Sequence, residues 1–597
     1  MIINQLCNIA KLRVNWYNIV GKMGDFMNKK INNIIGIILK IMFVIIIVVY
    51  ACSITPKVFQ NDTFYTIKIG ELISNSVEKC SDLLPWSKGL DMKDHFSYHN
   101  LPYTYPHWLY DLITFKVYNM GGFFAIYIAT NVLASVLGVL VYFVNIKLNK
   151  SHSISFLITM GTLYCMRGFI TARAQLVTFI LFILTIFCIE LFLKTKKIRY
   201  AIALIIIPIL IANFHCAVWP FYFVLYLPYI SEYMCLCITT YDYIGLFKKL
   251  DLKLYKKKLT KVQYENQKKN INESKARYIK NAESKLTNIN KLELKKEKNA
   301  KWLILIFIIC IFTGLCTPIK DVPYTYLIKT TQGNTTQNIN EHLPLILAKN
   351  SDMAVALTIV FGILIFSKSK VKLRYFFMLL GLIILSFYSQ RQTSMLYLIG
   401  NFILAKMICN VINNIRLMFD QKNKYEQELV FTKNITMIAI AVGIIVVSIF
   451  NFKNKANDSF VDEADYPVNA VKYINEKLIP TIGRENFRIY NEYNYGSYLL
   501  FQNIPVFIDS RADLYTPEFN GNKAENGKYV GKDIFSDFLA INNLSEDYES
   551  KFEQYEITHI ITYEDSKLSS LLERDENYSL LYSDKYFKIY ERESIYE

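Results

Sequence analysis

Asn33 to Thr63 reads NIIGIILKIMFVIIIVVYACSITPKVFQNDT and joins a long apolar run to a polar segment. Within 33–55 the single charged side chain is Lys40, and a helix of this length crosses roughly 30 Å of hydrocarbon. No small-residue cleavage site follows the run, and more apolar stretches come after it. We therefore predict an uncleaved first transmembrane helix rather than a signal peptide. Asp62 then lies just outside the membrane, about seven residues beyond the span.

Ten further apolar stretches predict a polytopic, all-α membrane bundle of about eleven transmembrane helices. The chain has 597 residues, of which 53% are hydrophobic and 20% are charged, and its mean hydropathy is +0.21. This balance indicates a membrane protein that also carries soluble segments. The stretches lie near 122–145, 154–170, 176–193, 200–215, 217–238, 302–318, 353–367, 372–388, 393–413 and 434–450.

Lys and Arg are concentrated in alternate loops, and the positive-inside rule makes those loops cytoplasmic. The cytoplasmic set includes the N-terminal segment 1–32 and the insert 241–301, whereas the loop 56–110 and the C-terminal segment 451–597 fall on the other side. We therefore expect a multi-pass protein of the cell membrane with a cytoplasmic N-terminus and an extracytoplasmic C-terminal domain. The remaining domains are then two transmembrane modules, 33–240 and 302–450.

The formal net charge of +17 is unevenly distributed, which bears on the choice between nucleic acid and lipid as a partner. The insert 241–301 holds 18 Lys and Arg against 7 Asp and Glu, while residues 451–597 hold 16 against 27. The insert favours helix by composition, so we interpret it as a solvated helical hairpin that rests on anionic lipid headgroups. Nucleic-acid binding is the minor alternative, and we expect no nucleic-acid partner.

After Phe450 the pattern changes to that of a soluble α/β domain. Strand-like runs occur at 487–491, 505–510, 558–563 and 586–591, with helical stretches at 467–477 and 534–541 between them. Their order predicts a small Rossmann-like sandwich. No glycine-rich phosphate-binding motif follows any of these runs, so the domain carries no nucleotide fingerprint.

The loop 56–110 is rich in carboxylates and histidines, and it supplies two candidate catalytic carboxylates, Asp62 and Asp94. A carboxylate at the membrane surface could remove a proton from an acceptor hydroxyl. The alternative for Asp62 is structural, because Asp is a good N-cap and a helix from Thr63 to Leu72 is expected directly after it.

Polar side chains also gather at the ends of the predicted spans, where they are costly unless they serve a substrate path. Arginine suits a lipid phosphate because its planar guanidinium can bind two oxygens at once. The alternative is that these arginines only reach toward the headgroups. The candidate substrate-binding residues are His107, Arg173, Gln175, Asn213, His215, Glu341 and Arg391.

His95, His99 and His107, together with Asp94, could hold a divalent metal. Their spacing matches no standard ligand set, so ordinary hydrogen bonding in an irregular loop is the favoured interpretation. We assign no metal ligand and no cofactor, and a divalent metal stays an open alternative.

A series of short motifs then resembles one family. The motifs are Asp62 with Tyr65 and Gly70, DHFS (94–97) before Trp108 and Leu109, RAQLVT (173–178), ANFH (212–215), NEHLP (340–344), QRQ (390–392), IYNEYNYGSYLL (489–500) and VFIDSRADLY (506–515). In this order the chain resembles the polytopic GT-C glycosyltransferases that use polyprenyl-phosphate-linked sugars. The likeness is to a bacterial branch with a C-terminal extracytoplasmic domain, and it covers most of the chain except the N-terminus and the insert.

The resemblance implies a membrane glycosyltransferase whose donor sugar is carried by a polyprenyl phosphate. Asp62 would take the place of the first-loop catalytic carboxylate, and Arg173 or Arg391 would meet the lipid phosphate. The acceptor would be a glycan, a lipid or a protein, and direct displacement would invert the anomeric centre. Two positions depart from the family pattern, since His107 replaces a frequent acidic residue and RAQ replaces the commoner Arg-Pro-Gln. For Asp509 and Arg511 we favour an internal salt bridge.

Two other classes of function stay open. The first is a non-catalytic polytopic protein that assists cell-envelope assembly, with the C-terminal domain as a binding module. The second is a lipid or glycan transporter, which would favour internal repeats and broken helices deep within the spans. Few such features occur in this sequence.

Overall fold

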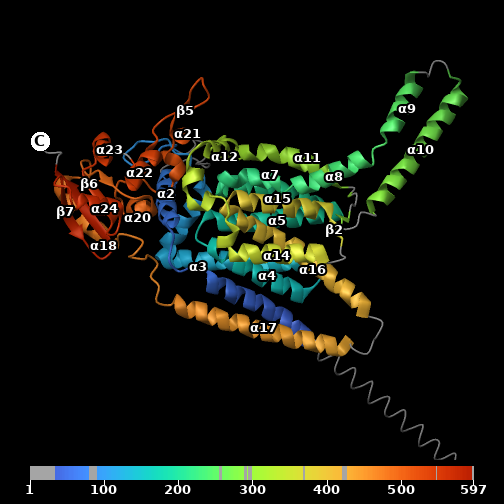
Figure 1. Ribbon diagram of the computed structural model, residues 1–597, viewed down its shortest axis with the longest axis horizontal. Coiled ribbons are helices and arrows are strands. Elements are labelled where there is room, and N and C mark those ends of the chain that lie inside the picture. Colours follow the sequence, from blue (N-terminus) through green and yellow to red (C-terminus); the bar gives the residue numbers. More distant parts are fainter. Residues whose placement is uncertain are drawn as a thin grey trace, which may run out of the picture.

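A computed structural model describes residues 34–78, 91–254, 259–287, 292–293, 297, 299–366, 370–419, 426–545 and 547–593. The basic N-terminal segment 1–32 lies outside these residues, as do parts of the insert 241–301. In Figure 1 a bundle of helices occupies the centre, the C-terminal part covers one end, and a long helical hairpin projects from the other end.

The bundle is built from the apolar stretches that the sequence indicates, and six of its described helical segments are long and apolar enough to cross a membrane. Four shorter apolar helices accompany them, so the number of crossings stays a prediction. The helices are Ile34–Ile54, α3 (Trp108–Asn149), α4 (His152–Met166), α5 (Ala174–Thr195), α6 (Ile198–Phe214), α7 (Trp219–Val224), α8 (Leu227–Thr239), α11 (Ala300–Ile311), α14 (Ser351–Phe366), α15 (Leu373–Tyr388), α16 (Thr393–Phe419) and α17 (Glu426–Asn454).

Helix α3 has 42 residues, about 63 Å at 1.5 Å per residue, which is twice the thickness of a hydrocarbon core. A kink at Gly121 and Gly122 divides it, and Gly122 takes φ +61° and ψ −149°, a conformation that side-chain-bearing residues rarely adopt. The part after the kink agrees with the predicted span 122–145. The part of α3 before the kink begins at Trp108 and lies beside α2. Its polar residues therefore lie at the end of the bundle.

The C-terminal part contains a four-stranded mixed sheet in the order β3-β6-β8-β7. β3 and β6 pair in parallel, whereas β6–β8 and β7–β8 are antiparallel. Its elements are α18 (Val468–Tyr473), α19 (Ile479–Ile482), β3 (Ile489–Tyr490), α20 (Tyr493–Phe501), α21 (Pro517–Asn520), β4 (Asn522–Lys523), β5 (Tyr529–Val530), α22 (Ile534–Asn543), α23 (Tyr548–Gln554), β6 (His559–Tyr563), α24 (Lys567–Leu572), β7 (Tyr578–Ser583) and β8 (Phe587–Arg592).

Two sequence-based expectations for this part are wrong. The sheet is mixed rather than Rossmann-like, since two of its three strand pairs are antiparallel. The run 505–510 is buried but is no strand beyond an isolated bridge between Val506 and Ser97. Its backbone bonds instead to side chains, because Asn491 Nδ2 donates to the carbonyl of Ile508 and Asn491 Oδ1 accepts from the amide of Phe507.

Helix α2 (Asn61–Glu78) lies between the bundle and the C-terminal part and packs on both. Toward the bundle it approaches α3 so closely that a Cβ on Gly70 would come within 2.1 Å of the Asp111 carbonyl oxygen. Toward the C-terminal part, Phe64 packs edge-on against Tyr498, with ring centroids 5.2 Å apart. The loop 56–110 and the C-terminal part therefore share one apolar core.

At the opposite end of the bundle, a buried arginine holds the base of the hairpin α9 (Tyr243–Leu254) and α10 (Lys261–Thr287). Arg374 pairs with both oxygens of Glu190, at 3.2 and 3.3 Å, and with Glu232 at 3.0 Å. Its side chain is only 2% exposed, and Glu297, near the return of the hairpin, lies 3.7 Å away. β1 (Leu292–Glu293) adds a short parallel pairing with β2 (Val371–Lys372).

We predict that Arg374→Met destabilises the protein by about 3–5 kcal/mol, because it leaves buried carboxylates without a partner. Thermal melting of the purified protein in detergent measures the change. Arg167→Met is the matched control, since Arg167 pairs with Asp352 at 2.7 Å but is 44% exposed, and an exposed pair contributes at most about 1 kcal/mol. Equal melting of the two variants would contradict the prediction.

Candidate active site

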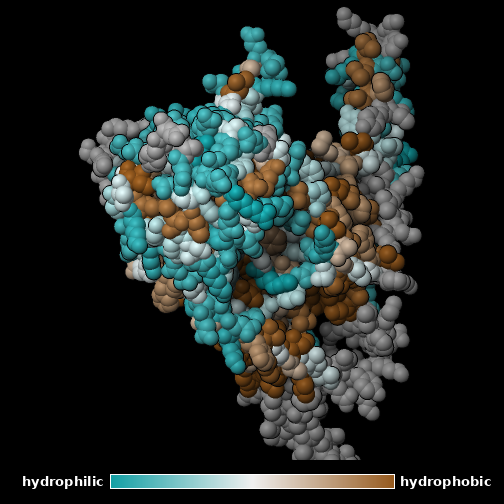
Figure 2. Space-filling model, turned by 60° about the vertical axis from the view of Figure 1, so that its left-hand side comes forward, coloured by the Kyte–Doolittle hydropathy of each residue, from teal (hydrophilic) through white to brown (hydrophobic). Residues whose placement is uncertain are grey.

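A cavity of about 1290 Å³ lies where the bundle meets the C-terminal part. Its wall brings together side chains from α2, from the starts of α3 and α5, from the 3₁₀ turns η6 (Asn340–His342) and η8 (Gln390–Gln392), and from residues 492–542. Figure 2 shows the surface hollowed between the teal C-terminal part and the brown surface of the bundle. Seven of the predicted site residues line the cavity: Asp62, His107, Arg173, Gln175, His215, Glu341 and Arg391.

Arg173 joins two carboxylates at the wall of this cavity. Its Nε lies 2.9 Å from Asp62 Oδ2, and its Nη1 donates to Glu341 Oε1 at 3.2 Å. Asp62 is in the first turn of α2, where the helix dipole also favours a negative charge. Since α2 already begins at Asn61, Asp62 does not occupy the N-cap position that the structural alternative requires. The side chains of Asp62 and Arg173 remain 23% and 22% exposed.

Backbone hydrogen bonds bring Glu341 and Arg391 into the same wall. The amide of Gln390 donates to the carbonyl of Leu343 at 2.9 Å, which ties η8 to the segment after η6. Arg391 lines the cavity, and no described carboxylate lies within ion-pair distance of its guanidinium. Of the two predicted phosphate-binding arginines, Arg173 is thus paired internally, whereas Arg391 faces the cavity without such a pair.

His107 and His215 form a second cluster, with ring centroids 4.9 Å apart. The amide of Cys216 donates to the carbonyl of Pro106, which draws the two loops together. Burial, Arg391 and Arg173 lower the pKa of His107 to about 3. The His107 imidazole is therefore neutral near pH 7 and can donate or accept hydrogen bonds in the cavity.

Two predicted residues lie outside the cavity lining and support it from behind. Asn213 Oδ1 accepts from Trp108 Nε1 at 3.1 Å, and its Nδ2 donates to the carbonyl of Cys316 at 2.9 Å. Asp94 is fully enclosed and contacts Arg511 rather than the cavity. The structure therefore does not place Asp94 where a catalytic carboxylate would reach a substrate, and we assign it a positioning role.

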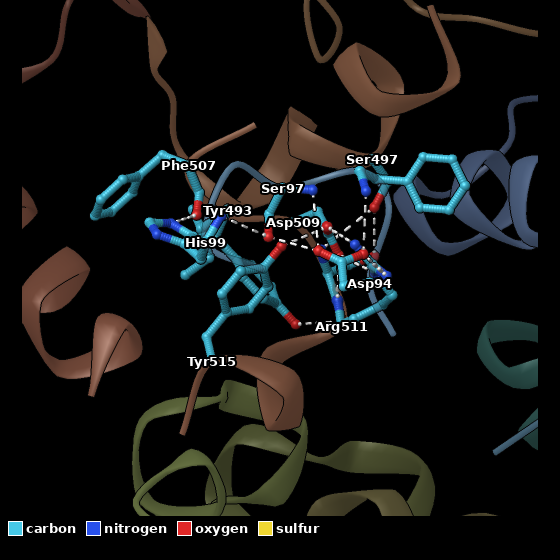
Figure 3. Close-up of polar contacts among 12 residues, drawn as sticks. Asp94, Ser97, His99, Tyr493, Ser497, Phe507, Asp509, Arg511 and Tyr515 are labelled. Atoms are coloured by element: carbon cyan, nitrogen blue, oxygen red, sulfur yellow. Dashed lines mark hydrogen bonds and ion pairs between the residues drawn. The ribbon is translucent and has the colours of Figure 1, made fainter. Parts of the chain in front are cut away.

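Arg511 joins the loop 91–105 to the C-terminal part (Figure 3). Its Nη1 donates to Asp94 Oδ1 at 2.8 Å, while its Nε and Nη2 donate to Asp509 at 2.9 and 2.6 Å. The Tyr515 hydroxyl donates to the same Asp509 carboxylate, and Ser97 donates to Asp94 through both its amide and its hydroxyl. The predicted salt bridge between Asp509 and Arg511 is confirmed, and it extends to Asp94.

The alternative metal site in the loop 91–107 is not formed. His99 Nε2 lies 2.9 Å from the Phe507 carbonyl, His95 pairs with Asp91 at 3.0 Å, and His107 faces His215. Within the described ranges, no three His, Cys, Asp or Glu side chains are grouped so that they could hold a metal ion. At the cavity wall a guanidinium lies between the carboxylates of Asp62 and Glu341, so we derive no step through a metal.

Two acidic residues of the cavity were not among the predicted site residues. Burial raises the pKa of Glu492 to about 7, and Asn61 Nδ2 donates to the neighbouring Tyr493 carbonyl, which places this segment against the start of α2. Asp513 accepts hydroxyl hydrogen bonds from Tyr326, Thr330 and Thr335 at 2.8, 3.2 and 3.0 Å. Glu492 lies in the motif 489–500 and Asp513 in the motif 506–515. Their presence in these motifs is the sequence feature that could have marked them as site residues.

We predict that Asp94→Asn lowers the stability of the protein by roughly 1.5–3 kcal/mol, the usual contribution of a hydrogen bond to a charged group. Burial alone would raise the pKa of Asp94, but Arg511 and Ser97 outweigh it and hold this pKa below its ordinary value. The difference in melting temperature is therefore fully present at neutral pH and is lost only as the pH falls through the lowered pKa. Asp91→Asn, at a side chain 60% exposed, is the control and should change little.

Comparison with known proteins shows the fold of the chain. No family model matches it, and no curated protein matches its sequence. Among solved structures it is similar to the oligosaccharyltransferase of Archaeoglobus fulgidus, crystallised with a tethered acceptor peptide that contains the NVT sequon. The TM-score is 0.50 at 11% sequence identity, and the match covers 88% of this chain and 69% of that one. The chain therefore shares the overall fold of that oligosaccharyltransferase.

Proposed function

We propose that this protein is an integral-membrane glycosyltransferase that moves a sugar from a polyprenyl-phosphate donor to an extracytoplasmic acceptor. The observation that carries the proposal is the cavity in which Asp62, Arg173, Glu341 and Arg391 meet at the junction of the bundle and the C-terminal part. The GT-C-like fold supports it, and so does the absence of a nucleotide-binding motif in the sequence.

The donor phosphate would bind Arg391. A phosphate anion needs a cation that no carboxylate holds at ion-pair distance, and Arg391 meets this condition among the described residues of the cavity, since Glu341 acts on it only from farther away. As the bond between the anomeric carbon and the phosphate oxygen breaks, negative charge grows on the leaving phosphate. A guanidinium that the protein already holds in position stabilises this charge more than water does.

Asp62 would accept the proton of the acceptor nucleophile. The acceptor oxygen or nitrogen forms the new bond to the anomeric carbon on the face opposite the leaving phosphate, so the anomeric centre is inverted. The proton passes to the Asp62 carboxylate as this bond forms. Arg173 orients the carboxylate, and Glu341 balances the second side of the guanidinium.

The acceptor would enter along the wall that the C-terminal part supplies. This wall presents the aromatic side chains of Tyr493, Phe535 and Phe538 together with the acidic side chain of Asp513. Aromatic faces suit both sugar rings and extended chains, so a glycan, a lipid and a protein acceptor all stay within the proposal.

Asp62→Asn should reduce sugar transfer from labelled polyprenyl-phosphate donors by about 10²–10⁴-fold, the range for loss of a general base. Its melting temperature should change little, because the pair with Arg173 is partly exposed and contributes at most about 1 kcal/mol. Asp91→Asn, in the same loop but outside the cavity lining, is the activity control. Full activity of folded Asp62→Asn would refute the assignment of the base. No turnover of the wild type with a broad donor panel would favour the non-catalytic envelope protein.

Arg391→Ala should lower kcat/KM for the donor by about 10–100-fold, since a hydrogen bond to a charged group contributes about 1.5–3 kcal/mol. Arg391→Lys should recover part of this loss, because lysine restores the charge but not the two-pronged geometry. Arg167→Ala, outside the cavity lining, should leave transfer unchanged. Donor kinetics that are the same for Arg391→Ala and the wild type would exclude Arg391 as the phosphate-binding residue.

A further inference from the structure

Helix α9 exposes an apolar stripe that no described residue covers. Leu246, Phe247, Leu250 and Leu254 are 41%, 66%, 49% and 77% exposed. Their spacing of i, i+1, i+4 and i+8 places them on one face of the helix. Leu252 is buried and lies on another face of the same helix. α9 therefore packs in the hairpin through that face, and the stripe is not needed for this contact.

The stripe lies within a strongly basic surface. Between 246 and 254 the chain has Lys248, Lys249 and Lys253 against the single acidic residue Asp251. Helix α10 adds further cations, and the insert as a whole carries 18 Lys and Arg against 7 Asp and Glu. A helix with an apolar face and lysines on its other faces is typical of helices that lie in the headgroup layer of an anionic membrane.

The position of the hairpin puts this stripe within reach of lipid. α9 begins four residues after Thr239, the last residue of the candidate membrane span Cys216–Thr239. In Figure 1 the hairpin leaves the end of the bundle obliquely and extends beyond its outline, and Figure 2 shows brown side chains on it. Arg374 pairs with Glu232 of α8 and lies 3.7 Å from Glu297, so one residue before the hairpin and one residue after it meet at the same buried arginine.

We propose that α9 is a membrane-surface anchor that binds anionic phospholipid. The apolar stripe inserts between the headgroups, and the neighbouring lysines pair with lipid phosphates. A soluble partner is disfavoured because α9 is joined directly to a membrane span, so lipid is always the nearest surface of matching chemistry. This inference is independent of the proposed transferase activity.

Hydrogen exchange of the full chain in nanodiscs tests the proposal. Amides at 246–254 should exchange at least about fivefold more slowly in equimolar phosphatidylcholine and phosphatidylglycerol than in phosphatidylcholine alone, the factor that one lysine near an anionic surface contributes. In the double variant Phe247→Ser/Leu250→Ser, amides at 246–254 should exchange faster than in the wild type in both lipids. Lys248→Gln/Lys249→Gln should lose only the difference between the lipids.

Val530→Ser is the control for an exposed apolar side chain, since Val530 is 69% exposed in the C-terminal part, and it should leave exchange at 246–254 unchanged. The substituted residues are exposed or half-buried, and thermal melting confirms that each variant folds. Equal exchange of the wild type in the two lipids would overturn the proposal. Protection that survives Phe247→Ser/Leu250→Ser would overturn the role of the stripe.

Discussion

The cavity depends on the ion pair between Arg511 and Asp94, because this pair joins the loop after the first span to the C-terminal part. Taking an arginine out of water costs several kcal/mol, and here Asp94 and Asp509 together offset that cost. α2, in the same loop, packs on α3 and on α20, and these contacts hold Asp62 at the cavity. The buried cluster around Arg511 holds the loop 91–105 against the C-terminal part of the cavity wall.

Four arginines near the two ends of the bundle fall into two groups that differ in exposure. Arg374 and Arg511 are 2% and 3% exposed and are surrounded by carboxylates, so they have no capacity left for a ligand. Arg511, Arg173 and Arg391 all line the cavity, and of these three only Arg391 has no described carboxylate within ion-pair distance. The sequence does not distinguish these roles, because all four lie near span ends or in recurrent motifs. Burial and pairing distinguish them, and they favour Arg391 as the residue that meets a phosphate.

Apolar runs predicted the helices of the bundle well, because a helix is the only spanning structure that satisfies its own backbone in lipid. Seven of the nine predicted site residues line one cavity, since span ends at the same side of a bundle converge. The run 505–510 was misassigned because Asn491 and the loop 96–99 satisfy its backbone, a long-range effect that no local pattern carries. The ion pair of Asp94 was not predicted for a similar reason, since its partner Arg511 lies 417 positions away.

Charge is divided between the two ends of the molecule, and this division links the proposed anchor to the proposed chemistry. The basic hairpin projects from one end of the bundle, while the acidic C-terminal part lies at the other (Figure 1). The cavity lies where the bundle meets the C-terminal part. If the basic end faces the cytoplasm, as the positive-inside rule predicts, the cavity opens on the other side of the membrane. The donor that we propose would then have crossed the membrane on its lipid before it reaches the cavity. Its phosphate would lie at the end of the bundle where η8 holds Arg391.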